Sequence, residues 1–227
     1  MDLNDRSTKV LLVIVVVFVG LLVVGAVYFG AQSGSTTPIS TTVDASKVKT
    51  DNEPFIGQAN APVTIVEWSD YQCPACKQFE LTALPQVMSS YIDTGKVKLV
   101  FKDMAFLGKD SITGGEYGRA VWKLYPDKYF TWRTAMYNAQ DQEGDQGFGN
   151  AATIDTLDAT ISGIDAAAVA ADVKANASTY DAMLTADKTE GQGLNVQSTP
   201  SFIIGTKLIA GSYPFDTFKA AIDPLVK

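Results

Sequence analysis

The chain has 227 residues, of which 46% are hydrophobic, and its 18 basic and 25 acidic residues give a formal net charge of −7. This length allows one sizeable domain with additions. The acidic balance argues against nucleic acid as a partner, because binding to a phosphate backbone depends on clustered Lys and Arg.

Residues 10–30 contain no charged side chain. A helix of about 20 apolar residues crosses a bilayer, whereas the apolar part of a cleaved signal peptide usually has about 7–15 residues. We therefore expect one uncleaved transmembrane helix, with a cleaved signal peptide as the alternative. Arg6 and Lys9 precede this segment and the next basic residue is Lys47. This bias places residues 1–9 in the cytoplasm and the rest of the chain outside.

Residues 31–52 are rich in Ser, Thr and Gly and show no apolar periodicity. Such a composition predicts a flexible linker. The folded domain is then expected to occupy residues 53–227.

The first elements of this domain form a strand–helix–strand unit. Residues 63–68 are short, apolar and rich in β-branched residues, which predicts a buried strand. A helix is expected at 74–94, where Pro85 should bend or break it, and a second strand at 96–104. Because strand–helix–strand connections are nearly always right-handed crossovers, the two strands should lie parallel.

The rest of the domain is expected to be mostly helical. Residues 111–190 are rich in Ala and carry periodic apolar runs, which predict roughly three to five helices. Two short strands at 201–205 and 207–211 are separated by a Gly-containing turn, so they should form an antiparallel hairpin. A last helix is expected at 215–226. The fold class is therefore α/β with a helical insertion.

Cys73 and Cys76 are the only cysteines, and the chain has no histidine. Zinc and iron–sulfur sites within one chain lack ligands here. A structural disulfide would close so short a loop that it gains little stability. We therefore favour a redox pair over a structural disulfide, with Cys73 at the first turn of a helix that favours its thiolate. Cys76 lies one turn further in and should be more buried.

The stretch NAPVTIVEWSDYQCPACKQFE (residues 60–80), the later TPSFIIG (199–205) and the helical block between them resemble the DsbA-like thiol–disulfide oxidoreductases. The resemblance covers about residues 52–227. It implies a thioredoxin-like fold with a helical insertion at about 111–190, catalysis by Cys73 and Cys76, and no bound cofactor or metal.

The resemblance also implies roles for three further residues. Thr199 and Pro200 match the family's cis-proline loop, in which backbone groups of Thr199 would pair with a substrate strand. Glu67, six residues before Cys73, would be a buried carboxyl that relays a proton to and from Cys76. The alternative for Glu67 is a pairing with a lysine such as Lys102, or exposure to water.

These features predict a single-pass membrane protein of a cell envelope with an extracytoplasmic catalytic domain. It would form disulfides in exported proteins with free thiols and be reoxidised by a membrane quinone-linked partner. Two departures keep a reductase or isomerase open as an alternative: Ala75 stands where oxidising members often have histidine, and Thr199 also occurs in reducing relatives. A third hypothesis is a tethered binding or chaperone module without catalysis.

Overall fold

The computed structural model describes residues 40–141 and 147–226. The predicted transmembrane helix at 10–30 lies outside these residues. Within the described ranges, none of the helices combines the length and the apolar character that crossing a bilayer requires.

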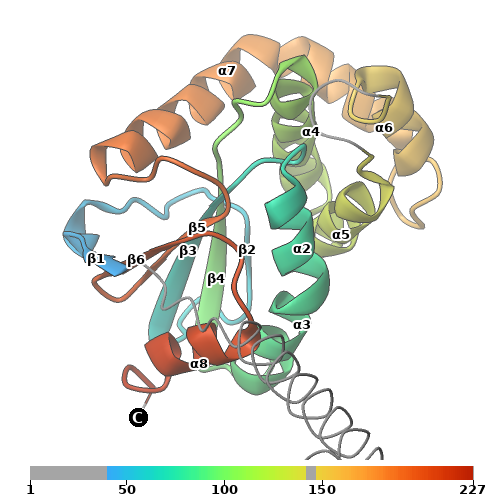
Figure 1. Ribbon diagram of the computed structural model, residues 1–227. Coiled ribbons are helices and arrows are strands. Elements are labelled where there is room, and N and C mark those ends of the chain that lie inside the picture. The colour runs from blue at the N-terminus through green and yellow to red at the C-terminus, as the bar shows by residue number, and fades with distance from the viewer. Residues whose placement is uncertain (1–39, 142–146, 227) are drawn as a thin grey trace, which may run out of the picture. The chain divides into compact units, whose positions relative to one another are not determined.

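The described strands form one six-stranded sheet in the order β1-β6-β5-β3-β4-β2 (Figure 1). The strands in chain order are β1 (Ser40–Thr42), β2 (Phe55–Ile56), β3 (Val63–Ser69), β4 (Val97–Asp103), β5 (Ser201–Ile204) and β6 (Lys207–Ala210). Strands β3 and β4 are parallel, and β5 and β6 form an antiparallel hairpin. Both predicted pairings are therefore confirmed.

The helix predicted at 74–94 is broken into three pieces. These are α2 (Pro74–Thr82), α3 (Leu84–Val87) and a π-helical segment η2 (Met88–Ile92). Pro85 lies in the first turn of α3, where its missing N–H leaves no helix hydrogen bond unmade. The break predicted from this proline is confirmed.

The helical insertion lies between β4 and β5. Its α-helices are α4 (Lys109–Leu124), α5 (Tyr129–Ala139), α6 (Ala151–Asp158) and α7 (Ala166–Gly193), with a 3-10 turn η3 (Pro126–Lys128) before α5. In Figure 1 they gather above and to one side of the sheet, and α7 runs across the top. The final helix is α8 (Phe215–Ile222).

Successive side chains of β3 point to opposite faces of the sheet. Ile65 belongs to the larger core cluster with α2 and α8, whereas Val66 and Trp68 belong to a second cluster on the other face. Three rings clamp α2 and α8 onto β5, with centroid distances of 4.5 Å between Phe79 and Phe202, and 5.0 and 4.9 Å from these two rings to Phe218. This packing holds α2 against β5, the strand that pairs with β3.

Residues 40–56 form a strap that reaches both edges of the sheet. Its strand β1 pairs antiparallel with β6 at one edge, and its strand β2 pairs antiparallel with β4 at the other. Between them lies a 3-10 turn η1 (Ala45–Lys47), and Val43 is buried. The flexible linker predicted through residue 52 is therefore wrong for residues 40–52. Composition did not reveal that this segment pairs with the sheet edges, because the pairing is made by backbone groups.

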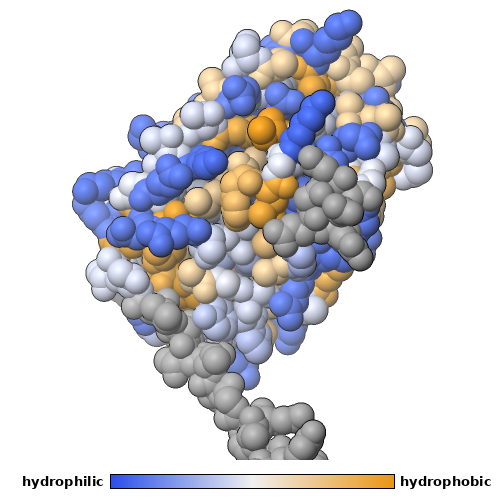
Figure 2. All heavy atoms as spheres, turned by 45° about the horizontal axis from the view of Figure 1, so that its top comes forward, coloured by the Kyte–Doolittle hydropathy of each residue, from blue (hydrophilic) through white to orange (hydrophobic). Residues whose placement is uncertain are grey.

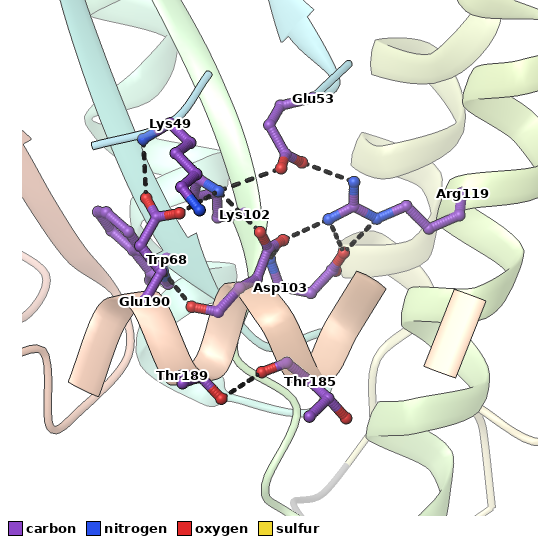
Figure 3. A network of polar contacts seen from close by, with 10 residues as sticks. Lys49, Glu53, Trp68, Lys102, Asp103, Arg119, Thr185, Thr189 and Glu190 are labelled. Carbon is purple, nitrogen blue, oxygen red and sulfur yellow. Dashed lines mark hydrogen bonds and ion pairs between the residues drawn. The ribbon is translucent and has the colours of Figure 1, made fainter. Parts of the chain in front are cut away.

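A network of buried charges ties this strap to the domain (Figure 3). Glu53 of the strap accepts hydrogen bonds from Lys102 of β4 at 3.1 Å and from Arg119 of α4 at 2.6 Å. The same two cations also contact three further carboxylates, those of Asp103, Asp187 and Glu190. The backbone N–H of Lys49 donates to Glu190 at 2.9 Å, so α7 holds the strap as well.

Candidate active site

The loop that leads from β3 into α2 is shaped by Asp70. One carboxylate oxygen of Asp70 accepts from the backbone N–H of Gln72 at 2.8 Å, and the other accepts from that of Phe106 at 2.9 Å. The carbonyl of Asp70 accepts from the N–H of Cys73 at 3.1 Å. Cys73 is thereby placed as the N-cap residue of α2, followed by Pro74 as its first residue.

The two sulfurs have different surroundings. Both cysteines are free thiols; Cys73 is 7% exposed and Cys76 is fully buried. A hydrogen bond from Cys76, with others from Thr199 and backbone amides, lowers the pKa of Cys73 to about 6 against the opposing effect of burial. Burial, together with the neighbouring charge of Cys73, raises the pKa of Cys76. Cys73 is therefore the sulfur that can be an anion near neutral pH.

The loop before β5 lies against Cys73. The Thr199–Pro200 peptide bond is cis, as the family resemblance implied. The thiol of Cys73 donates to the carbonyl oxygen of Thr199 at 3.3 Å. The hydroxyl of Thr199 is buried and has no hydrogen-bond partner within the described residues, so it can donate to the sulfur once Cys73 is a thiolate.

Glu67 is fully buried and pairs with Arg133 of α5 at 3.1 Å. The suggested pairing with Lys102 is wrong, because Lys102 is in register with Trp68 and its side chain joins the charge network that holds the strap. Burial raises the pKa of Glu67 to about 7, although Arg133 opposes this shift. Oxygen Oε2 of Glu67 has no hydrogen-bond partner in the part of the chain that the structure describes.

The sequence reasoning missed two residues of α5 and its end that contact this site. Arg133 reaches Glu67, and the amide Nε2 of Gln140 donates to the carbonyls of Tyr71 at 2.7 Å and Cys73 at 3.1 Å. Lys77 is half-buried, and its ammonium donates to the carbonyl of Gln140 at 2.7 Å. The only sequence signal for these contacts was Arg133 itself, a single arginine within the aromatic run YFTWRTAMYNA.

Figure 2 brings the upper end of Figure 1 forward and shows apolar surface bordered by hydrophilic side chains. In the segment after β4, Phe106 and Ile112 are 45% and 40% exposed. The backbone N–H of Phe106 donates to Asp70, so this exposed ring is fixed to the loop that carries Cys73.

Comparisons with known proteins agree with this geometry. A family model described as thioredoxin matches residues 49–224. A Bacillus anthracis protein named "Probable disulfide bond formation protein D" is 30% identical over 172 residues, 76% of this chain and 77% of the relative. The chain belongs to the DsbA-like thiol–disulfide oxidoreductases of the thioredoxin family. Disulfide bond formation protein D of Bacillus subtilis is 27% identical to this oxidoreductase over 77% of the chain and 78% of the relative.

Solved structures of related proteins share the fold. The crystal structure of oxidised BdbD from Bacillus subtilis has a TM-score of 0.71 and 25% identity, covering 84% of this oxidoreductase and 98% of that chain. The thiol–disulfide exchange protein α-DsbA2 from Wolbachia pipientis has a TM-score of 0.69 and 27% identity, covering 79% and 90%. The predicted fold and the predicted class of enzyme are confirmed, and a module without catalysis is not supported.

Proposed function

We propose that this oxidoreductase forms disulfide bonds in exported proteins as an extracytoplasmic enzyme. The observation that carries the proposal is the asymmetry of the two sulfurs, with the pKa of Cys73 lowered to about 6 and that of Cys76 raised. A low-pKa thiol is a good leaving group in disulfide exchange. The reduced form of the enzyme is thereby stabilised, which favours passing the disulfide to a substrate.

In the oxidase direction, a substrate thiolate attacks Sγ of Cys73 in the Cys73–Cys76 disulfide. A bond forms between the substrate sulfur and Cys73, and Cys76 leaves and takes up a proton. A second substrate thiolate then attacks the substrate sulfur of this mixed disulfide. Cys73 leaves as a thiolate, the substrate is oxidised by two electrons and the enzyme holds both electrons as a dithiol.

Thr199, Pro200 and Glu67 are proposed to assist these steps. The backbone at Thr199 lies beside Cys73, where an extended substrate segment can add as a strand. Glu67 is proposed to give a proton to Cys76 when this sulfur leaves and to take it back on reoxidation. Its raised pKa of about 7 suits a group that must both bind and release a proton near neutral pH.

The proposed location and redox partner rest on the N-terminal sequence, on the relatives and on the family resemblance. The apolar, uncharged residues 10–30 are proposed as a single transmembrane anchor with the domain outside, in a compartment where disulfides persist. Relatives named for disulfide bond formation support the oxidase direction. Reoxidation by a membrane quinone-linked partner is proposed from the family resemblance alone.

A reductase or isomerase remains the second candidate, because Ala75 supplies no histidine between the cysteines. A redox titration of the Cys73–Cys76 pair in glutathione buffers separates the two. An oxidase should have a potential nearer to about −120 mV than to about −270 mV. It should also oxidise a reduced, unfolded substrate, and the Cys73→Ser variant should not. A potential near the lower value would overturn the oxidase direction and leave the reductase.

A further inference from the structure

The side chain of Arg133 extends from the helical insertion into the core, where it reaches β3 and α2. It is 1% exposed, and its three guanidinium nitrogens have three separate acceptors. Nη2 donates to Oε1 of Glu67 at 3.1 Å, Nε to Oε2 of Glu80 at 3.0 Å, and Nη1 to Oγ of Ser69 at 3.2 Å. These contacts fix the guanidinium against β3 and α2 at once.

Aromatic rings also pack against the same group. The guanidinium carbon lies 4.1 Å from the ring centroid of Phe101 and 5.0 Å from that of Tyr137. Cation–π contacts of this kind suit the planar guanidinium better than the compact ammonium of lysine. Arg133 therefore has one defined position.

Glu67 is held at only one end. Its Oε1 is bound by Arg133, whereas its Oε2 is buried and has no hydrogen-bond partner among the described residues. Glu80 differs, because both of its oxygens are bound, one by Arg133 and the other by the hydroxyl of Thr134 at 3.0 Å. Of these two carboxyls, Glu67 is therefore the one that has an oxygen available to take up a proton.

We propose that Arg133 is a positioning residue for thiol–disulfide exchange, which holds Oε1 of Glu67 so that Oε2 accepts and returns the proton of Cys76. This inference rests on the proposed relay by Glu67. The charges of Glu67 and Cys76 interact, since the carboxylate raises the pKa of Cys76. The helical insertion would thus supply part of the proton-transfer machinery of the thioredoxin-like core.

The step in question is the closure of a mixed disulfide. When Cys73 carries glutathione, the proton of Cys76 passes to Oε2 of Glu67 and the resulting thiolate attacks Sγ of Cys73. The bond between Cys76 and Cys73 forms, the bond to glutathione breaks, and glutathione leaves as a thiolate with the electron pair. This first-order step contains no binding event, so it reports on proton transfer and sulfur attack alone.

Several other titratable groups act on Glu67 or Arg133 and must be considered in any pH profile. From the segments packed around them these are Cys73, Cys76, Glu80, Tyr71, Tyr129, Tyr137 and Asp103. Burial raises the pKa values of the three tyrosines. They stay neutral around pH 7, where the relay is expected to titrate.

The test follows closure after the reduced full chain is mixed with oxidised glutathione, using acid quenching and mass spectrometry across a pH series; the thiolate of Cys73 first attacks oxidised glutathione and releases one glutathione thiolate. In the native protein the rate should rise with pH through an inflection near about 7, the raised pKa of Glu67. In Arg133→Met the inflection should move upward by about 1–3 pH units, because an opposite charge lowers a carboxyl pKa by about that amount. Closure at pH 7 should then slow by about fivefold or more, because the deprotonated fraction of Glu67 falls from about one half to about one tenth or less. Because Arg133→Lys keeps the positive charge, its inflection should lie between those of the native protein and Arg133→Met.

A double-variant cycle separates positioning from packing. If Arg133 acts through Glu67, the pair Glu67→Gln with Arg133→Met should close as slowly as Glu67→Gln alone. An equal slowing by Arg133→Met in both backgrounds would overturn the inference. Arg119→Met is the matched control. This arginine is also buried, but it forms ion pairs with the carboxylates that hold the strap and not with Glu67. It should lower stability and leave the inflection in place.

A further variant covers the case in which Arg133→Met does not fold. The charge of Glu80 raises the pKa of Glu67, so Glu80→Gln should move the inflection downward, while its amide oxygen can still accept from Nε of Arg133. An unmoved inflection would count against the inference. A native protein that oxidises substrates but shows no inflection would remove the relay and this inference while leaving the oxidase intact.

Discussion

The thiol of Cys73 lies 3.3 Å from the carbonyl oxygen of Thr199, a residue 126 positions later in the chain. This contact joins the N-terminal end of α2 to the loop before β5. The reactive sulfur therefore lies between a helix terminus, whose free N–H groups favour an anion, and the loop whose backbone is proposed to bind an extended substrate segment.

The first prediction concerns the ionisation of Cys73. In the reduced protein its thiolate absorbance should titrate at about pH 6, because hydrogen bonds from Cys76, Thr199 and backbone amides stabilise the anion. Cys76→Ala should raise this pKa, since the bond from Cys76 is the largest favourable contribution. Cys73→Ser should show no titration in this range. If Cys73 titrated near the ordinary value of about 8.5, the proposed leaving-group role would be lost.

The second prediction concerns the hydroxyl of Thr199. Thr199→Val keeps the shape of the side chain and removes a hydroxyl that has no partner among the described residues while Cys73 is a thiol and that helps to lower the pKa of Cys73 by donating to its thiolate. The pKa of Cys73 should rise and alkylation of the reduced protein near pH 6 should slow. The matched control is Thr206→Val in the exposed hairpin turn, which should change neither quantity. Equal effects at both positions would contradict the assignment.

The third prediction is a pH dependence of stability. The folded pKa of Cys73, about 6, lies below the unfolded value of about 8.5. The contribution of Cys73 to the stability of the reduced form is therefore complete above about pH 8.5 and is lost as the pH falls through about 6. The oxidised form has no thiol at this position. The free energy of unfolding of the reduced form should therefore increase relative to that of the oxidised form as the pH rises across this window.

Urea unfolding of the oxidised and reduced proteins at several pH values measures this difference. The raised pKa of Glu67 makes a contribution of opposite sign, which weakens both forms as the pH rises through about 7 and cancels in the comparison to first order. Parallel pH profiles for the two forms would show that the thiolate is not selectively stabilised by folding.

The fourth prediction tests how α5 holds the loop that carries Cys73. Gln140→Leu removes the amide that donates to the carbonyls of Tyr71 and Cys73. Leaving buried carbonyls unpaired should cost about 1–3 kcal/mol in the free energy of unfolding. Asn138→Leu, two residues earlier and exposed, should cost less than about 0.5 kcal/mol. Similar values for the two variants would contradict a specific role of Gln140.

The fifth prediction separates stability from chemistry. Glu53→Ala removes the carboxylate that joins the strap to Lys102 and Arg119, and breaking a buried ion pair in this way costs about 3 kcal/mol. The pKa of Cys73 should stay at its native value. Asp51→Ala, at an exposed position of the same strap, is the control and should be nearly neutral. A changed thiol pKa in Glu53→Ala would show coupling between the strap and the active site.

The sequence was informative where local pattern decides the structure. The apolar run at 63–68 gave β3, Pro85 marked the helix break, and Cys-Pro-Ala-Cys after a strand marked the redox pair. Each of these signals depends on a few neighbouring residues. The cis bond at Pro200 followed only from the family resemblance.

Contacts between distant segments were not readable in the same way. Arg133 meets Glu67 because α5 packs on α2, and nothing local to either residue specifies that docking. The suggested pairing of Glu67 with Lys102 is wrong because of the strand register. Glu67 is aligned with Phe101, and Lys102 is aligned with Trp68. The strap was missed because the pairing of Ser40–Thr42 with β6 uses backbone groups that composition does not reveal.

The strap has a practical consequence for any shortened version of this protein. A recombinant fragment that starts at residue 53, where composition suggests a domain border, would lose β1 and leave the outer edge of Lys207–Ala210 bare. An uncovered edge with the sequence KLIA is a template for intermolecular strand addition and aggregation. A soluble fragment should therefore begin upstream of Ser40, so that its own backbone caps the sheet.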